Sequence, residues 1–261
     1  MSTSKPSNEL TVEETIRKTF SLYMREFVTF FAPSLILMLT YEFAISRFYE
    51  QYKTVPPLDP NWSSAEILNY FSTYLVPLLS MLLAILVVFW ILSVLVSGII
   101  IKAASELTEK GVTSLETAFI FTIGKIPRLL LVNLIVSILI ALGAVAFIIP
   151  GIIVFIVYSL TQQAVIIEDA KALDSLSRSK TLVSNRWLKT FALTFSVWLI
   201  TLFVYFVGSL LAAPFGAYSW IASGAITALA TPLPTIALTV HYYSMLAREQ
   251  QKFFPLPPPP F

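Results

Sequence analysis

Residues 74–101 read YLVPLLSMLLAILVVFWILSVLVSGIII and contain no charged side chain. A run of this length and polarity can satisfy its backbone hydrogen bonds in hydrocarbon only as a spanning helix. Residues 129–149, 191–213 and 220–247 have the same character. The sequence therefore predicts an all-α, polytopic integral membrane protein.

Two further segments are apolar over shorter or less uniform stretches. Residues 27–46 contain Glu42, and residues 151–167 follow the preceding span with only Pro150 between them. Counting both, the sequence predicts six transmembrane helices. The composition agrees, because 57% of the residues are hydrophobic, 12% are charged and the mean hydropathy is +0.80, as in membrane proteins. The chain has no cysteine, which excludes disulfide and thiol chemistry.

The basic residues indicate how these helices are oriented. Of the 17 Lys and Arg residues, all but Arg47 and Lys53 fall on one side of the predicted spans. Under the positive-inside rule this side is the cytoplasm, so we expect a multi-pass protein of the cytoplasmic membrane with both termini inside. The outer side is expected to hold one loop, roughly residues 47–71, and tight turns at Pro150-Gly151 and at residues 214–216.

A weak internal repeat divides the chain. Residues 11–15 (TVEET) recur as residues 113–117 (TSLET), each with Glu three positions after Thr, which predicts a capping box at a helix start. A looser third copy has Lys171 at the cap position. We expect a polar segment at residues 1–10, one membrane domain at 11–252 with repeats at about 11–110, 111–170 and 171–252, and a proline-rich tail at 253–261.

Each repeat is predicted to consist of an amphipathic interfacial helix followed by a transmembrane hairpin. Two spans return the chain to its starting side, so all three amphipathic helices would lie on the cytoplasmic face. These helices are either linkers anchored to the lipid surface or a collar that recognises a lipid headgroup or a protein partner. Anionic lipid explains the basic face without nucleic acid. The candidate headgroup or partner contacts are Arg17, Lys18, Lys125, Arg128, Arg178, Lys180, Arg186 and Lys189.

The central part of the chain resembles a known membrane family. The residues that carry the resemblance are Ile148 to Ile153 around Pro150-Gly151, Ser159, Ala164 to Asp169, Ala172-Leu173, Ser177 to Ser179, Leu182-Val183 and Trp187, with Pro234, Tyr242-Tyr243 and Arg248 near the end. This pattern is similar to the membrane domain found beside glycerophosphodiester phosphodiesterases and to the related YciC-like and archaeal six-helix proteins. The resemblance implies a six-helix fold and a membrane location more than an activity.

An inventory of reactive residues argues against an enzyme. The predicted loops leave no room for a phosphodiesterase barrel, and the only histidine is His241. Zinc ligation by Cys and several His is excluded, and no G-x-S-x-G, H-E-x-x-H or phosphate-binding glycine loop occurs. The adjacent Glu168 and Asp169 point in different directions on a helix, so they are poorly placed to share a proton or a metal. We expect them to be solvated at the helix end and to pair with nearby Lys or Arg. No catalytic residue, cofactor or metal is predicted.

Polar residues at membrane depth are the other candidates for function, because such groups are costly unless they face protein or water. Glu42 reaches the outer interface or lines an outward-facing cavity. His241 is expected to be a hydrogen-bonded residue near the inner boundary, with a proton relay as the alternative. Asn133, Gln162 and Gln163 are expected to form interhelical hydrogen bonds. Pro232 and Pro234 interrupt the last span near its middle, where many transporters build binding sites.

These observations predict a non-enzymatic membrane protein that contacts lipid or organises a partner through its cytoplasmic helices. The alternative is a permease or channel-like subunit with its pathway near Pro232 and Pro234. Transport predicts a wet cavity that reaches Pro232, whereas scaffolding predicts a packed interior. The tail at residues 253–261 favours polyproline II and either docks a partner or frays at the membrane surface.

Overall fold

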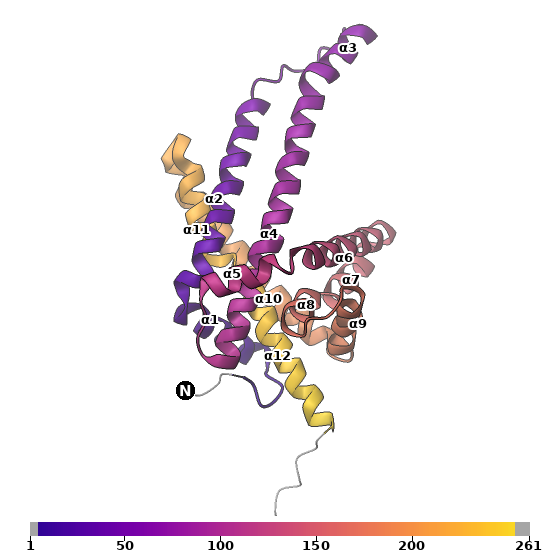
Figure 1. Ribbon diagram of the computed structural model, residues 1–261. Helices are drawn as coiled ribbons and strands as arrows, with labels where there is room; N and C mark the ends of the chain where they lie inside the picture. The colour runs from indigo at the N-terminus through magenta and orange to yellow at the C-terminus, as the bar shows by residue number, and fades with distance from the viewer. Residues whose placement is uncertain (1–4, 254–261) are drawn as a thin grey trace, which may run out of the picture.

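The computed structural model describes residues 5–253, and all regular elements in this range are helical (Figure 1). Five helical segments are long and apolar enough to cross a membrane: Phe27–Tyr52, Ser64–Glu109, Ile126–Val145, Ile148–Ile167 and Trp187–Gln251. The chain is therefore an all-α, multi-pass membrane protein. Most of the proline-rich tail, residues 254–261, lies outside the described residues.

The first hairpin is long and its connecting loop is short. Helix α1 (Val12–Arg25) leads into α2 (Phe27–Tyr52). After the loop, α3 (Ser64–Tyr70), a π-helical turn (Phe71–Leu75) and α4 (Val76–Lys110) follow without interruption. The loop expected at residues 47–71 is thus confined to 53–63, because α2 continues to Tyr52 and the Ser63 side chain caps α3 in a capping box with Glu66.

The middle of the chain forms a second hairpin, which projects sideways from the upright α2 and α4 (Figure 1). Helix α5 (Leu115–Ile123) packs on α4 and leads into this hairpin, which comprises α6 (Ile126–Ala146), α7 (Ile148–Val157) and α8 (Thr161–Ile167). The expected turn at Pro150-Gly151 is wrong by a few residues. The chain reverses at Phe147, which is extended, and Pro150 lies in the first turn of α7, where proline is tolerated because no intrahelical donor is needed there.

The last part of the chain contains α9 (Ala172–Val183), α10 (Trp187–Ala212), a 3-10 turn (Ala213–Tyr218), α11 (Ser219–Ala230) and α12 (Leu233–Phe253). The chain reverses at Gly216, whose φ of 53° and ψ of −118° favour glycine. Helix α11 then packs along α10 and α2. The expected interruption of the last span is confirmed at residues 231–232, between α11 and α12.

The largest core cluster lies where α2, α4, α10, α11 and α12 meet, with Phe30, Ile100, Leu107 and Ile236 almost completely buried. The outward faces of the hairpins remain apolar, as at Val145 and Phe203, which are 87% and 67% exposed. Apolar side chains of this size are stable on the surface because hydrocarbon surrounds them.

The predicted helix caps are only partly correct. Thr11 accepts a hydrogen bond from the Glu14 amide, and the Glu14 carboxylate accepts one from the Thr11 amide, which confirms the capping box of α1. The second box is wrong, because the cap of α5 is Ser114 and its side chain makes no capping bond. The Thr113 hydroxyl instead donates to Glu106 of α4, 3.2 Å away.

A side chain at Gly98 would collide with α5. A Cβ atom there would overlap Thr122 and lie 3.0 Å from Leu129 Cδ1, whereas the nearest neighbour of a Cβ at Gly124 is 3.5 Å away. We expect Gly98→Ala to destabilise the protein by about 1–3 kcal/mol through overpacking. Gly124→Ala is the matched control and should leave stability unchanged. The Tm of each variant in mild detergent tests this, and equal values would contradict close packing of α5 on α4.

Candidate functional site

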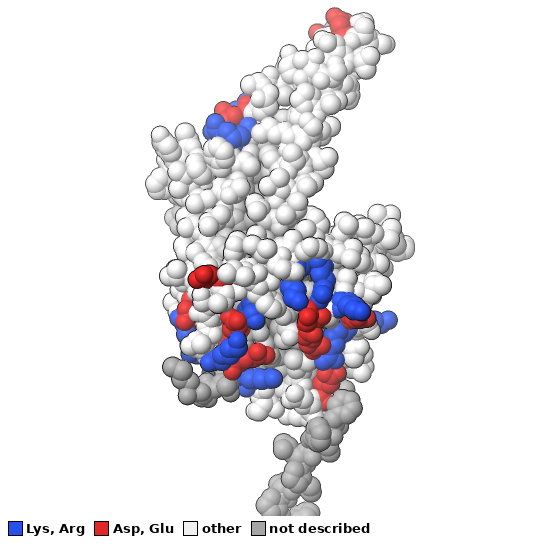
Figure 2. All heavy atoms as spheres, in the orientation of Figure 1, with Lys and Arg blue, Asp and Glu red and all other residues white. Residues whose placement is uncertain are grey.

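Charged side chains gather at one end of the molecule. Figure 2 shows them in a band below a broad uncharged region, with a few more near the tips of α2 and α3. The band combines basic and acidic residues, and many of them form ion pairs between segments that are distant in sequence. Many of its basic side chains are therefore neutralised within the protein.

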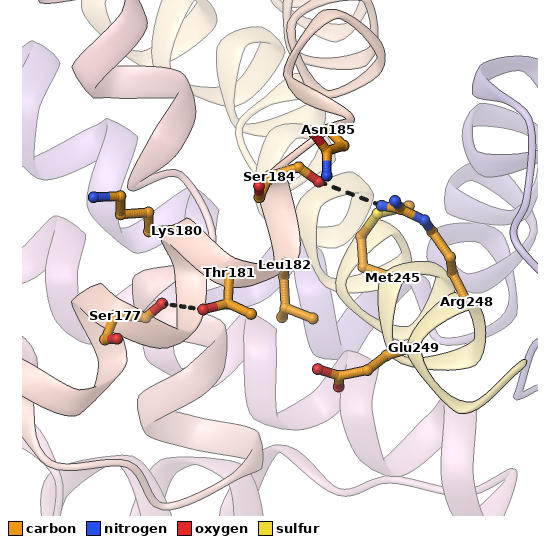
Figure 3. Close-up of a pocket in the computed structure, with 9 residues that line it drawn as sticks. All are labelled: Ser177, Lys180, Thr181, Leu182, Ser184, Asn185, Met245, Arg248 and Glu249. Atoms are coloured by element: carbon orange, nitrogen blue, oxygen red, sulfur yellow. Dashed lines mark hydrogen bonds between the residues drawn. The ribbon is translucent and has the colours of Figure 1, made fainter. Parts of the chain in front are cut away.

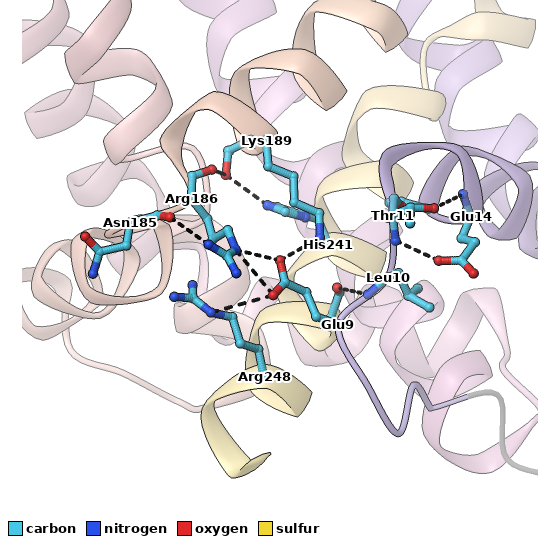
Figure 4. A network of polar contacts seen from close by, with 12 residues as sticks. Glu9, Leu10, Thr11, Glu14, Asn185, Arg186, Lys189, His241 and Arg248 are labelled. Carbon is cyan, nitrogen blue, oxygen red and sulfur yellow. Dashed lines mark hydrogen bonds and ion pairs between the residues drawn. The ribbon is translucent and has the colours of Figure 1, made fainter. Parts of the chain in front are cut away.

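Glu9 is the centre of the first ion cluster (Figure 4). Its Oε1 accepts hydrogen bonds from Arg186 Nε at 2.9 Å and Lys189 Nζ at 2.6 Å, and its Oε2 lies 3.6 Å from Arg248 Nε. Burial alone would raise the pKa of Glu9, but the hydrogen bonds from Lys189 and Arg186 outweigh it, and the pKa lies below its ordinary value of 4.5. Glu9 thus joins the N-terminal segment to α10 and α12 as a carboxylate.

Neighbouring contacts fix the same segment. The Leu10 amide donates to Ser244 Oγ of α12 at 2.8 Å, one residue before the cap of α1. Behind this layer, His241 is completely buried and its Nε2 is 2.9 Å from the Thr190 hydroxyl, while its Nδ1 has no partner among the described residues. His241 is therefore a hydrogen-bonded residue of the protein interior.

Asp169 is the centre of the second ion cluster. Its carboxylate accepts hydrogen bonds from Lys125 and Arg128, and the Arg128 guanidinium also donates to the Asp169 carbonyl at 2.9 Å. The hydrogen bonds from Lys125 and Arg128 lower the pKa of Asp169. These contacts attach the segment before α9 to the first turn of α6.

The two clusters use corresponding positions. Glu9 and Asp169 each lie two residues before the cap residue of an amphipathic helix, Thr11 for α1 and Lys171 for α9. Their basic partners are the cap residue and the third residue of a long helix. These partners are Arg186 and Lys189 for α10, and Lys125 and Arg128 for α6. We call the two clusters the acid–base clasps.

Arg178 makes the third set of ion pairs. Its Nε donates to Glu168 Oε2 at 2.8 Å and its Nη2 to Glu249 Oε2 at 2.7 Å. The hydrogen bond with Glu249 raises the pKa of Arg178, assisted by Glu168. Because guanidinium donors match carboxylates bidentately, Arg178 ties α9 to the end of α8 and to α12. Its donors are used within the protein rather than presented to a headgroup.

A polar groove lies beside these clusters, between the end of α9 and α12 (Figure 3). Its volume is about 600 Å³. Lys180 and Asn185 are exposed, and Arg248, at the opposite wall, donates to the Ser184 carbonyl at 3.5 Å. The groove is lined by Ser177, Lys180, Thr181, Leu182, Ser184, Asn185, Met245, Arg248 and Glu249. We call it the α9/α12 groove.

The remaining basic candidates are on α1. Arg17 is exposed and pairs with Glu13 at 2.7 Å, an arrangement worth little in water. Lys18 is half-buried, and its burial lowers its pKa. Of the eight basic candidates, Lys180 is the one that lines the α9/α12 groove.

The candidates at membrane depth occupy separate places. Glu42 accepts a hydrogen bond from Ser223 of α11 at 2.9 Å, at a hollow of about 290 Å³ between α2, α10 and α11. Gln162 donates to Asn133 at 2.8 Å, an interhelical bond of the expected kind between α8 and α6. Gln163 is buried, and its Oε1 has no partner among the described residues.

The helix break is packed rather than hollow. Pro232 and Leu233 are buried and Pro234 is half-buried. Ala230 and Ile236, on either side of the break, are 1% and 0% exposed. Within residues 5–253, no group of three or more His, Asp or Glu side chains is placed to hold a metal ion.

Sequence reasoning found only part of the acidic half of this site. The expected pairing of Glu168 and Asp169 with Lys or Arg is confirmed, whereas Glu9 was assigned to a polar N-terminal segment and Glu249 was not singled out. A signal did exist for the clasps, because an acidic residue two positions before a cap occurs at both Glu9 and Asp169. Their partners are far away in sequence, so spacing alone could not pair them.

The Glu9 cluster predicts a defined pH dependence. The folded-state pKa of Glu9 lies below 4.5, so its stabilising contribution is present above that pH and is lost as the pH falls through the folded value. We expect Glu9→Gln to lower stability by about 1–3 kcal/mol at pH 7, the usual loss for hydrogen bonds to a charged group.

The Tm of the wild-type protein and of Glu9→Gln, measured in detergent from pH 3 to pH 7, checks this. The two curves should converge at the acid end. The control is Glu13→Gln, which removes the exposed ion pair between Glu13 and Arg17 of α1. Its Tm should equal that of the wild type at every pH. A Tm difference for Glu9→Gln that persists unchanged at pH 3 would contradict the assignment.

Comparisons with known proteins give one result. Searches among curated proteins and among solved structures give no match. The family model described as a domain of unknown function, DUF7847, matches residues 69–246, from the end of α3 to α12. The match gives no link to the YciC-like family that the central motif resembles. Since it covers more than half of the 261 residues, the chain belongs to the DUF7847 family.

Proposed function

We propose that this protein is a non-enzymatic lipid-binding component of the cytoplasmic membrane. In this proposal six helices cross the bilayer, both termini are cytoplasmic, and the chain consists of three direct units. Each unit has an interfacial helix, α1, α5 or α9, followed by a hairpin of long helices. The α9/α12 groove then binds an anionic lipid headgroup on the cytoplasmic face.

Matching burial supports the three-unit arrangement. Every position in residues 11–25 is buried, half-buried or exposed in the same way as its counterpart 160 positions later, in residues 171–185. Aligning the caps of α1, α5 and α9 also aligns two buried positions one turn apart. These positions hold small residues in all three helices: Thr15 and Thr19, Ala118 and Thr122, and Ser175 and Ser179.

The packing order of the units also supports this arrangement. Helix α1 packs on α12 and α10, α9 packs on α8 and α6, and α5 packs on α4. Each interfacial helix thus covers the unit that precedes it, and α1 closes the cycle by covering the last unit. The two acid–base clasps lie at two of these three junctions.

The α9/α12 groove is the observation that carries the proposed function. Lys180 and Arg248 line it together with three hydroxyl side chains and the Asn185 amide, groups that suit a phosphate and its polar substituents. Glu249 also lines the groove, but its carboxylate is held by Arg178. Arg248 is shared with Glu9, so Lys180 supplies the positive charge that favours an anion in the groove. Four of the other basic candidates are engaged in the clasps, and Arg178 is engaged by Glu168 and Glu249.

Packing at the helix break favours this proposal over transport. A pathway through the Pro232 region would need a water-filled space, since freed backbone carbonyls and passing ions must be solvated. The buried Pro232, Leu233 and Ile236 fill this place with apolar atoms. Scaffolding or lipid binding requires no such space.

The proposed topology can be tested with single cysteines, because the chain has none of its own. We expect Asp59→Cys, Phe147→Cys and Phe215→Cys to react with an impermeant maleimide added to intact cells, since all three would lie outside. Lys110→Cys and Lys171→Cys should react only after permeabilisation. Reaction of Phe215→Cys only after permeabilisation would exclude six crossings.

The headgroup proposal predicts a loss of anionic lipid from a single substitution. Native mass spectrometry of the protein, incubated with equal amounts of phosphatidylglycerol and phosphatidylcholine, should give a preference for phosphatidylglycerol. Lys180→Gln should reduce the retention of phosphatidylglycerol about fivefold, because a lysine near an anionic lipid contributes roughly 1 kcal/mol to binding.

Lys110→Gln is the matched control for that experiment. It removes the same charge from a lysine that is 63% exposed and lies outside the groove, at the end of α4. Its retention of phosphatidylglycerol should equal that of the wild type. Equal losses in both variants would indicate nonspecific attraction to the basic face and would refute a headgroup site in the groove.

A further inference from the structure

The interfacial helix α5 differs in chemistry from α1 and α9. Where α1 has Arg17 and Lys18, the aligned residues of α5 are Ile120 and Phe121. Phe119, Ile120 and Ile123 of α5 are 42%, 63% and 49% exposed. Because large exposed apolar side chains of this density are stable in hydrocarbon, we expect this exposed face of α5 to contact lipid tails.

The junction at α5 also has no acid–base clasp. The position two residues before the α5 cap, which holds Glu9 or Asp169 at the other junctions, is Val112. At the start of α2, the cap residue is Glu26 and the third helical residue is Thr29, where α6 and α10 have basic residues. The contact described between these segments is a hydrogen bond from Arg25 to the Gly111 carbonyl.

An apolar furrow opens at this junction. A hollow of about 540 Å³ lies between α2, α4 and α5, and its walls include Ile36, Leu95 and Phe119. A second apolar hollow of about 220 Å³ continues between α2 and α4 and shares Leu92 with the first. Together they follow α4 from residue 99 to residue 84, a length of about 22 Å at 1.5 Å per residue. We call this feature the α2/α4 furrow.

We propose that the α2/α4 furrow binds one acyl chain of a membrane lipid, which enters through the unclasped junction at α5. This inference rests on the three-unit arrangement proposed above, which identifies the α5 junction as the one without a clasp. This site is distinct from the α9/α12 groove, which in our proposal binds a lipid headgroup.

Shape and chemistry identify the occupant as a lipid tail. The furrow is long, and its lining is apolar apart from Glu116 in the first turn of α5 and Thr40 and Tyr41 of α2. One leaflet of the hydrocarbon core is roughly 15 Å deep, so the furrow can take an entire chain. An empty furrow would forfeit dispersion contacts along both walls, and we expect acyl chains to contact the exposed face of α5.

Glu116 suggests what is attached to the chain. It lines the same hollow and lies in the first turn of α5. A carboxylate at the end of an apolar furrow accepts hydrogen bonds from a hydroxyl or ammonium group. The lipid is therefore one whose headgroup carries such a donor, and the glycerol headgroup of phosphatidylglycerol meets this requirement.

Photocrosslinking tests the site directly. The full chain is reconstituted in phosphatidylcholine vesicles with a small fraction of phosphatidylglycerol that carries a diazirine on one acyl chain, and crosslinked peptides are mapped by mass spectrometry. We expect crosslinks to concentrate on the furrow walls, at residues 92–99 and 115–119. Excess unlabelled phosphatidylglycerol should suppress them.

Two variants fill the furrow. Ile36 and Leu115 line it and are 69% and 36% exposed, so Ile36→Trp and Leu115→Trp add bulk without entering the core. Each should reduce furrow crosslinking about tenfold, equivalent to about 1.4 kcal/mol. Leu83→Trp, at a residue of the same hairpin that is 63% exposed and outside both hollows, is the matched control and should have no effect.

The opposite outcomes would overturn the proposal. Crosslinks spread evenly along the hairpin, or equal crosslinking in all three Trp variants, would mean ordinary lipid contact without a site. Crosslinking abolished by dimer formation would mean that a second copy covers the furrow. Lys180→Gln, run in parallel, separates this result from the headgroup proposal, since it should alter phosphatidylglycerol retention at the α9/α12 groove and leave the furrow crosslinks in place.

Discussion

The ion pairs of Glu9 and Asp169 fix how the charged end of the molecule is assembled. Each carboxylate reaches the cap residue and the third residue of a long helix, and so sets the position of an interfacial helix relative to that long helix. The Glu9 contacts are worth more than contacts on an aqueous surface, because Glu9 and Lys189 are largely withdrawn from solvent, whereas the Asp169 side chain is 64% exposed. Desolvation would make an unpaired charge costly at Glu9 or Lys189. The paired arrangement is therefore the one that the fold can retain.

The sequence predicted the long helices well and the clasps poorly, for one physical reason. A span such as α4 must satisfy its own backbone bonds in hydrocarbon, so its composition specifies it locally. The Glu9 to Lys189 contact joins residues 180 positions apart, and nothing local specifies it. The capping box of α1 joins two neighbouring residues, so the local sequence specifies it, and it was predicted correctly. The reversal at Phe147 depends on how α6 and α7 pack at Gly143 and Gly151, and it was misplaced.

The basic residues illustrate a related limit. Their asymmetric distribution predicts an orientation, because orientation depends on charge summed over loops. Whether a given lysine or arginine contacts lipid depends on its neighbours in space. Arg178 has two carboxylate partners, whereas Lys180, two residues away, faces a groove. Charge counting alone treats these residues as equivalent.

In the proposed three-unit arrangement, the unit that departs from the other two is the one that borders the α2/α4 furrow. Helices α1 and α9 share their burial pattern and their clasps, which is what a common structural role requires. Helix α5 keeps the small buried pair Ala118 and Thr122, so it packs on α4 in the same manner, yet its other faces are apolar and its clasp residues are replaced. Stability alone would favour three clasped junctions. The α5 junction has no clasp and borders the α2/α4 furrow. An acyl chain can therefore exchange there between the furrow and the surrounding lipid without breaking an ion pair.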